Sequence, residues 1–346
     1  FTTDPYMLIR KNGKLIARGV MDDKGPCVII IYVLAALKKA GFIPEHNVRL
    51  LFGCDEESGW QDIEYAKKHG VIPKRGYSPD ADYPLINKEK GILTLGLNKE
   101  LKSDKIMSIK AGEAVNAVPD ICEALLGISK EETEKLFEIC NVKAEIEETE
   151  KGCHVRVKGR ASHASIPHQG DNAGIKMLSV LKELDKNFTD LYERFKNVRG
   201  TGLGFSNVNL TCTLSKIDYN DGKLKLNVDM RHPHDIEFNQ VDATIKSALR
   251  DFEIDLINHN PIHSVDENDP LCTLLLKAYE METGNVGRPR SIGGGTYSRA
   301  FETGVAFGCT FEHEPMCAHM ADEFMLEESV KMNLRIQLQG IYQLCR

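Results

Sequence analysis

The hydrophobic pattern of the chain changes character twice, near residues 100 and 268, and these changes constrain the fold more than any other feature. Before the first change, strand and helix patterns alternate. We expect a short strand at Lys14–Ala17, an apolar helix at Cys27–Ala40, a strand at Val48–Gly53, a charged helix around Asp62–His69 and a short strand that ends at Ser78. Alternation of this kind is typical of an α/β unit with parallel strands.

Between the two changes, the pattern indicates a different kind of unit. Segments such as CHVRVKG and GKLKLNVDM alternate apolar and polar residues, and amphipathic helices separate them. Helical patterning returns from about Asn268 and ends in a helix over Glu327–Cys345. Because a chain of 346 residues favours two domains, we expect a first domain made of residues 1–100 and 265–346, with residues 101–264 inserted as an α+β domain.

The composition argues against several classes of partner. The formal net charge of -7 is spread along the chain, and no basic run could neutralise several phosphates, so we expect no nucleic-acid partner. The most apolar stretch, Cys27–Leu37, has about half of the roughly 20 residues that a membrane-spanning helix needs. The 10 cysteines include no CxxC pair and lie mostly in apolar segments, which favours reduced thiols and a cytoplasmic location.

Three groups of acidic residues fall at the ends of predicted strands or turns. They are Asp22 and Asp23 before the apolar helix, Asp55–Glu57 directly after the strand VRLLF, and Asp80 and Asp82 in the turn SPDADYP. Taken singly, a helix start, a solvated acidic turn and an ordinary aspartate turn would explain them. Three adjacent carboxylates repel one another, however, unless a cation or a proton neutralises them. With His319, the groups supply oxygen and imidazole ligands of the kind that zinc, manganese and cobalt bind.

Six motifs occur in a defined order along the chain: GVMDDKGP, GCDEESGW, SPDADYP, SHASIPHQGDNA, GGGTYSRAF and HMADEF. In this order they resemble the metal-dependent dipeptidases of the PepV/Sapep type, in the aminoacylase and carboxypeptidase clan, over nearly the whole chain. The resemblance implies a zinc-exopeptidase-like α/β catalytic domain, with a mainly parallel sheet and helices on both faces, and an inserted α+β domain of the lid or dimerisation type. It also implies a hydrolase that cleaves small peptides and that is a monomer or a homodimer.

The same resemblance assigns roles in a metal site. It implies two divalent metal ions, zinc first and manganese or cobalt as alternatives. Asp22 would bridge the two ions, Glu57 and Asp80 would each bind one of them, and His319 would complete one ligand set. Glu56 would be the general base, because a water that bridges two cations loses a proton far more readily than bulk water does.

In the inserted domain, the resemblance implies residues that contact the substrate. His163 of SHAS would stabilise the tetrahedral oxyanion with help from Asn116, and Arg231 of DMRHP would bind the substrate carboxylate through its guanidinium fork. The glycine-rich turn would offer backbone donors to the same end of the substrate, from Gly294, Gly295 and Thr296. Without the family context, a surface histidine, a turn asparagine, a salt-bridged arginine and a flexible turn would explain these residues.

The sequence departs from the family pattern at one point. Family members carry an HxD motif upstream of the segment that corresponds to TTDPY, and the sequence begins at Phe1 without this motif. We therefore expect one metal ion to lack a histidine ligand and the aspartate that orients it, with reduced metal affinity or activity as the consequence.

Other functions remain open at this stage. An N-acyl amino acid deacylase would use the same metal core, and a catalytically incomplete paralogue would bind peptides without cleaving them. His232 and His234 in RHPHD resemble the HxH pair of amidohydrolase barrels, but the flanking segments do not supply eight strand-helix units. GGGTYSR lacks the spacing of the common phosphate-binding loops.

Overall fold

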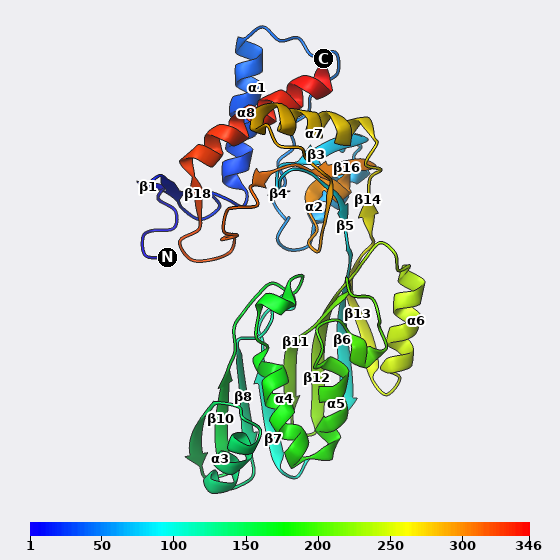
Figure 1. Ribbon diagram of the computed structural model, residues 1–346. Helices are drawn as coiled ribbons and strands as arrows, with labels where there is room; N and C mark the ends of the chain where they lie inside the picture. The colour runs from blue at the N-terminus through cyan, green and yellow to red at the C-terminus, as the bar shows by residue number, and fades with distance from the viewer. The chain divides into compact units, whose positions relative to one another are not determined.

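The computed structural model describes residues 1–346 and divides the chain into two units (Figure 1). Unit 1 consists of Phe1–Glu89 and His263–Arg346, and unit 2 consists of Lys90–Ile262. The first boundary expected from the sequence, at residue 101, is too late. The strand β6 (Gly91–Glu100) belongs to unit 2 because it pairs along its length with β12 (Lys223–His232).

Unit 1 is built around a mixed sheet with helices packed against it. The strands of the main sheet run in the order β14, β5, β16, β3, with β15 beside β5. Their bounds are β3 (Arg75–Ser78), β5 (Ile86–Glu89), β14 (His263–Ser264), β15 (Arg290–Ile292) and β16 (Thr303–Ala306). The pairs β16–β3 and β15–β5 are parallel, whereas β14–β5 and β16–β5 are antiparallel. The α/β class expected from the sequence is confirmed, with antiparallel pairs added to the parallel ones.

Two small sheets complete the strands of unit 1. The first joins the two ends of the chain: β1 (Ile9–Lys11), β2 (Lys14–Ile16) and β18 (Phe324–Leu326). The second pairs β4 (Ala81–Asp82) with β17 (Cys309–Thr310) in parallel. The first of these sheets matters for the site, because it brings the residues before α1 beside those that precede α8.

The helices of unit 1 form its hydrophobic core with the sheet. They are α1 (Lys24–Lys39), α2 (Gln61–Lys68), α7 (Pro270–Thr283), α8 (Glu327–Cys345) and the short 3₁₀ helix η4 (Tyr297–Ala300). Helix α1 packs against α8 and buries Ile29, Val33 and Leu37 on one face. This spacing of apolar residues is that of a helix with one buried stripe.

The strand expected at Val48–Gly53 does not form. These residues follow an irregular path, and no strand pair includes them. Val48 is 42% exposed and Phe52 is 58% exposed. A run of β-branched and aromatic residues becomes a strand only where a neighbour pairs with it and covers one face, so the composition of VRLLFG alone was misleading.

Unit 2 contains one antiparallel sheet of eight strands, in the order β13, β6, β12, β11, β7, β8, β10, β9. The remaining strands are β7 (Ile106–Ala111), β8 (Ile121–Leu126), β9 (Ala144–Thr149), β10 (Gly152–Lys158), β11 (Thr211–Asn220) and β13 (Glu253–Asn260). Buried and partly exposed residues alternate along β8 and β10, as the sequence pattern predicts for strands with one covered face.

Helices cover this sheet and supply the rest of its core (Figure 1). They are α3 (Lys130–Ile139), α4 (Ala173–Leu184), α5 (Thr189–Phe195), α6 (Phe238–Ala248) and the 3₁₀ helices η1 (Pro167–Gln169), η2 (Lys186–Phe188) and η3 (Thr201–Leu203). Helix α4 contacts β7, β8, β10 and β11 and buries Met177 and Leu181 completely. Across both units, no helix combines the length and the apolar character that crossing a membrane requires.

Candidate metal centre

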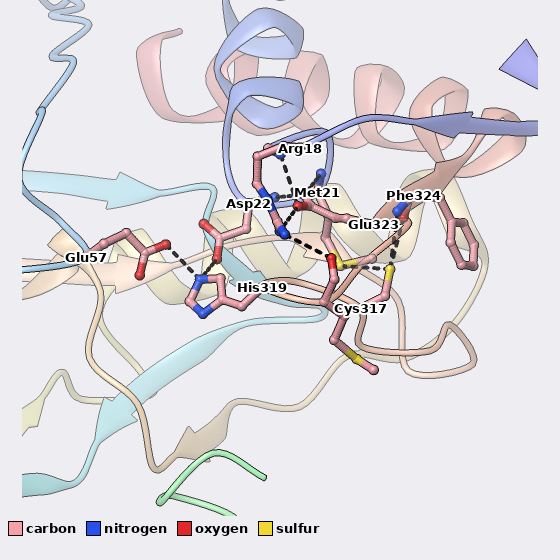
Figure 2. Close-up of polar contacts among 10 residues, drawn as sticks. Arg18, Met21, Asp22, Glu57, Cys317, His319, Glu323 and Phe324 are labelled. Carbon is pink, nitrogen blue, oxygen red and sulfur yellow. Dashed lines mark hydrogen bonds and ion pairs between the residues drawn. The ribbon is translucent and has the colours of Figure 1, made fainter. Parts of the chain in front are cut away.

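Three side chains from distant parts of the sequence converge in unit 1 (Figure 2). The Nε2 atom of His319 lies 2.9 Å from Oδ2 of Asp22 and 2.7 Å from Oε1 of Glu57. The ligand atoms of the three residues all lie within 4.8 Å of one another. Two carboxylates and one imidazole at this spacing form a donor set that one divalent cation can bridge.

Each of the three residues is carried by a turn at the end of an element. Asp22 comes two residues before α1, Glu57 lies in the turn that precedes α2, and His319 lies in the loop that leads into β18. His319 has a φ of 62°, a backbone conformation that is unusual for a residue with a side chain. Outliers of this kind are concentrated at functional sites, where the surrounding structure holds them.

The imidazole of His319 is strongly favoured in its protonated form. Hydrogen bonds to Asp22 and to Glu57 raise the pKa of His319 to about 10, against the opposing effect of partial burial. The two carboxylates therefore create a local field that attracts positive charge. A divalent cation would bring two positive charges to the same carboxylates, whereas the protonated imidazole brings one.

Glu56 has an environment unlike that of its neighbour Glu57. Burial raises the pKa of Glu56 to about 8, and the negative charges of Glu57, Asp22, Asp23 and Glu89 contribute in the same direction. Glu57, in contrast, is exposed and points toward His319. The two adjacent glutamates are therefore suited to different tasks: Glu56, which is partly buried, to accepting a proton, and Glu57 to binding a metal ion.

Asp80 lies close to the same group of charges. It lies in the turn between β3 and β4, and burial raises the pKa of its carboxyl well above the usual value. Asp22, Glu56, Asp23 and Glu57 raise the pKa further, which shows that their charges act on Asp80. The structure thus brings Asp22, Glu57, Asp80 and His319 into one electrostatic cluster with Glu56. Asp80 does not belong to the three-residue group around His319.

The turn that carries Glu56 and Glu57 is fixed by Asp55. Its carboxylate accepts hydrogen bonds from the hydroxyl of Ser58 and from the backbone N–H of Gln61 at 2.9 Å. These bonds lower the pKa of Asp55. Asp55, the first of the three adjacent carboxylates, is therefore a local structural residue rather than a metal ligand.

Tyr297 of η4 holds the same turn from the other side. Its hydroxyl donates to Oδ2 of Asp62 at 2.6 Å and accepts from the backbone N–H of Asp55 at 3.2 Å. The rings of Tyr297 and Trp60 meet edge to face with centroids 5.2 Å apart. The glycine-rich turn and the acidic turn are therefore joined through one side chain.

The glycine-rich turn is anchored by Glu89, a residue that is 1% exposed. Glu89 accepts hydrogen bonds from the backbone N–H of Thr296 at 3.2 Å, from its hydroxyl at 2.7 Å and from the hydroxyl of Ser298 at 2.8 Å. Arg299 forms an ion pair with the same carboxylate. The backbone N–H of Thr296 is thus bound by Glu89 in this structure, and Gly294, Gly295 and Thr296 stay the predicted donors to the substrate.

The predicted substrate residues of the insert lie in unit 2. Asn116 and His163 come from adjacent segments, because the carbonyl of Asn116 accepts from the N–H of Ala164 at 2.9 Å. The Nδ1 atom of His163 lies 2.7 Å from the hydroxyl of Ser165. Arg231 is 4% exposed, and its Nε and Nη2 atoms donate to the two carboxylate oxygens of Asp229 at 2.7 and 2.8 Å.

Comparison with known proteins identifies the family. The chain matches peptidase family M20/M25/M40 over residues 2–342. It belongs to this peptidase family. It is 34% identical to a β-Ala-Xaa dipeptidase of Lactobacillus delbrueckii subsp. lactis, across 100% of this chain and 79% of that protein. It is 32% identical to the putative dipeptidase YtjP of Bacillus subtilis, across 100% of this chain and 80% of that protein.

A solved structure of the M20 family supports the fold. The metallo-carboxypeptidase Sso-CP2 of Sulfolobus solfataricus matches with a TM-score of 0.56 and 13% identity, over 99% of this chain and 81% of that one. The sequence-based assignment to metal-dependent peptidases, and with it the expectation of a hydrolase, is thereby confirmed at the level of the M20 family.

Membership of the M20 family implies divalent metal ions, and the residues present fit them. The convergent oxygen and imidazole atoms of Asp22, Glu57 and His319 form a donor set suited to zinc or manganese. The sequence reasoning missed three supporting residues, Glu89, Tyr297 and Glu323. The signal for Glu323 was its place in HMADEF, four residues after His319.

Proposed function

We propose that this protein hydrolyses the peptide bond of dipeptides at a site formed by Asp22, Glu57 and His319, with Glu56 as the general base. The convergence of the three ligand atoms within 4.8 Å carries the proposal. Membership of the peptidase family and the dipeptidase names of the relatives support it. Small peptides are the corresponding substrates.

The proposed site takes two divalent ions, with zinc as the first choice. Asp22 would be shared between the ions, Glu57 and Asp80 would each bind one, and His319 would complete one ligand set. Burial of Asp80 and its interaction with the charges of Asp22 and Glu57 support a place beside the second ion. When bound, the ions supply Lewis acidity and a nucleophilic water of lowered pKa.

Glu56 performs the proton transfers in the proposed mechanism. Its carboxylate accepts a proton from the attacking water and then delivers this proton to the amine that leaves. Burial and neighbouring charges raise the pKa of Glu56 well above that of an exposed glutamate, so the protonated form is accessible during the reaction. Asp55 and Tyr297 keep the turn in place during both transfers.

For the rest of the substrate we propose the residue roles that the family resemblance implies. His163 and Asn116 would stabilise the oxyanion, and Gly294 and Gly295 of unit 1 would add backbone donors. Arg231 would bind the substrate carboxylate. Its bidentate pair with Asp229 fixes the guanidinium plane, which favours recognition in one orientation.

We also place the protein in the cytoplasm. All ten cysteines are free thiols in the structure. This redox state fits a reducing compartment.

A substrate panel tests the proposed function. The full chain, incubated with Zn²⁺ and separately with Mn²⁺, is assayed with Leu-Gly, β-Ala-His and N-acetyl-leucine by ninhydrin detection of released amines. The proposal predicts cleavage of at least one of the two dipeptides and no release from N-acetyl-leucine. Cleavage of N-acetyl-leucine alone would favour the deacylase, and binding without turnover would favour the incomplete paralogue.

A further inference from the structure

Glu323 occupies an unusual position beside the candidate metal centre. It lies four residues after His319, its side chain is buried, and the residue is 0% exposed. A buried carboxylate is costly unless hydrogen bonds or a countercharge compensate it. The contacts of Glu323 therefore indicate what it contributes to the fold.

All the groups that bind the carboxylate come from one short segment, residues 18–22 (Figure 2). Its Oε1 atom accepts from the backbone N–H groups of Met21 at 2.8 Å and Asp22 at 3.1 Å. Its Oε2 atom accepts from the N–H of Gly19 at 3.0 Å and from Nη1 of Arg18 at 2.8 Å. One side chain thus satisfies three backbone donors of the turn that carries Asp22.

Two further hydrogen bonds join the same two segments. The N–H of Ala17 donates to the carbonyl of Glu323 at 3.2 Å, and Nη2 of Arg18 donates to the carbonyl of Met320 at 3.1 Å. Strand β18 begins at the next residue and pairs with β2, with Phe324 opposite Ile16. The segment with Asp22 and the segment with His319 are therefore joined on both sides of Glu323.

We propose that Glu323 is a positioning residue that sets the spacing between Asp22 and His319 and thereby the metal affinity of the centre. This inference rests on the metal site of the proposed function and adds a residue to which no role has been given. Glu323 does not contact the three ligand atoms. It acts through the backbone of Asp22, whose N–H it binds, while His319 sits on the same loop as Glu323 itself.

Two substitutions of Glu323 separate the effect of its hydrogen-bond geometry from the effect of its charge. Glu323→Gln keeps the shape of the side chain but has one acceptor oxygen in place of two. Glu323→Asp keeps the negative charge but is one methylene too short to reach all four donors. Because residues that orient metal ligands typically contribute about 10- to 100-fold to metal affinity, we expect the Kd for Zn²⁺ to rise by about tenfold or more in both variants.

The measurement is a competition titration of the metal-free full chain with Zn²⁺ and a chromophoric chelator, which needs no turnover. Glu327→Gln is the matched control, since it removes a carboxylate four residues later that pairs with Arg10 at the surface. The control should bind Zn²⁺ like the wild type. A wild-type Kd in Glu323→Asp, with a raised Kd in Glu323→Gln, would mean that charge alone matters and would overturn the proposal.

Arg18→Met provides a second test if the Glu323 variants do not fold. The side chain of Arg18 is 35% exposed, and in this variant three backbone N–H groups still bind the buried carboxylate of Glu323. Loss of the anchor should raise the Kd for Zn²⁺ several-fold, whereas a purely electrostatic effect would lower it because a nearby positive charge is removed. An unchanged or lower Kd contradicts the positioning role.

The Zn²⁺ titration of the wild type distinguishes a failure of the proposed metal site from a failure of the proposed role of Glu323. If the wild-type chain binds no Zn²⁺, the proposed metal site fails, and the role of Glu323 fails with it. If the wild type binds Zn²⁺ and folded Glu323 variants bind it equally well, only the positioning role is wrong.

Discussion

At the scale of single residues, the acidic turn Asp55–Glu57 shows how adjacent carboxylates acquire different properties. Asp55 binds Ser58 and the N–H of Gln61 and has a lowered pKa, whereas burial raises the pKa of Glu56. Glu57 is exposed and lies 2.7 Å from His319. The sequence indicated that the negative charges of three adjacent carboxylates need neutralisation. Only the backbone path decides which carboxylate faces which neighbour.

Glu56→Gln tests the assignment of the general base. Because the amide cannot accept the proton from water, we expect kcat to fall by about 100-fold or more, with Zn²⁺ content unchanged. Asp22→Asn should lose both turnover and Zn²⁺, since it removes a metal ligand. Dipeptide hydrolysis and elemental analysis of the same preparations separate the two roles. Turnover at the wild-type rate in Glu56→Gln would show that another group accepts the proton.

Elements with their own hydrophobic stripe were predicted well. The helix expected at Glu327–Cys345 has these bounds in α8, and the strand expected to end at Ser78 is β3. The helix expected at Cys27–Ala40 begins earlier, at Lys24, because the three residues before the apolar run also join it. Amphipathic periodicity depends on residues that are close in the sequence, so the elements that it predicts are found in the fold.

Elements that depend on distant partners were predicted less well. Val48–Gly53 has the composition of a strand but no neighbour to pair with. Strand β6 was assigned to the wrong unit, because its pairing with β12 and β13 is visible only in the sheet. In the site, the same limit applies to Glu323: its acidic character was evident, but its three backbone donors were not.

Tyr297→Phe tests the link between η4 and the acidic turn. The variant keeps the ring contact with Trp60 but loses the hydrogen bonds to Asp62 and to the N–H of Asp55. Because this turn carries Glu56, we expect kcat to fall by about tenfold while the thermal midpoint changes little. Tyr65→Phe, at an exposed position on α2, is the control and should match the wild type. A wild-type kcat in Tyr297→Phe would show that the turn is held without the hydroxyl.

The ion-pair cluster at Asp251 predicts a pH dependence of stability in unit 2. Burial alone raises the pKa of Asp251, but hydrogen bonds from Arg194 and Lys99 outweigh it and lower the pKa from 3.8 to about 2. A lowered pKa in the folded state stabilises the fold above pH 3.8, and this contribution is lost as the pH falls toward 2. The cluster joins β6 to α5, so the effect belongs to the packing of these elements.

Asp251→Asn should lower the free energy of unfolding by about 1 kcal/mol at pH 7, because partial exposure of the carboxylate screens its ion pairs. The difference from the wild type should shrink between pH 4 and pH 2. Urea denaturation at several pH values measures it. Asp242→Asn breaks an exposed pair with Lys246 on α6 and should have a smaller effect. An Asp251→Asn difference that persists unchanged at low pH would contradict the account.

At the scale of the whole molecule, the chain folds into two units that differ in architecture. Unit 1 carries Asp22, Glu57 and His319 on turns of a mixed α/β fold, and unit 2 is an antiparallel sheet with helices that is inserted between Glu89 and His263. The two changes of hydrophobic pattern indicated such an insertion, because strands with one covered face and alternating strand-helix units differ in period. The six motifs, in their order along the chain, indicated the family because each of them lies in a local stretch of sequence.

The most direct test of the central claim is the zinc content of the full chain, measured by elemental analysis after equilibration with Zn²⁺ and mild dialysis. The wild type is compared with His319→Ala and with His313→Ala, a histidine outside the three-residue group, as the control. The account predicts at least one zinc ion per chain in the wild type and the control, and a loss of bound zinc in His319→Ala. Equal zinc content in all three proteins would contradict the assignment of the metal centre.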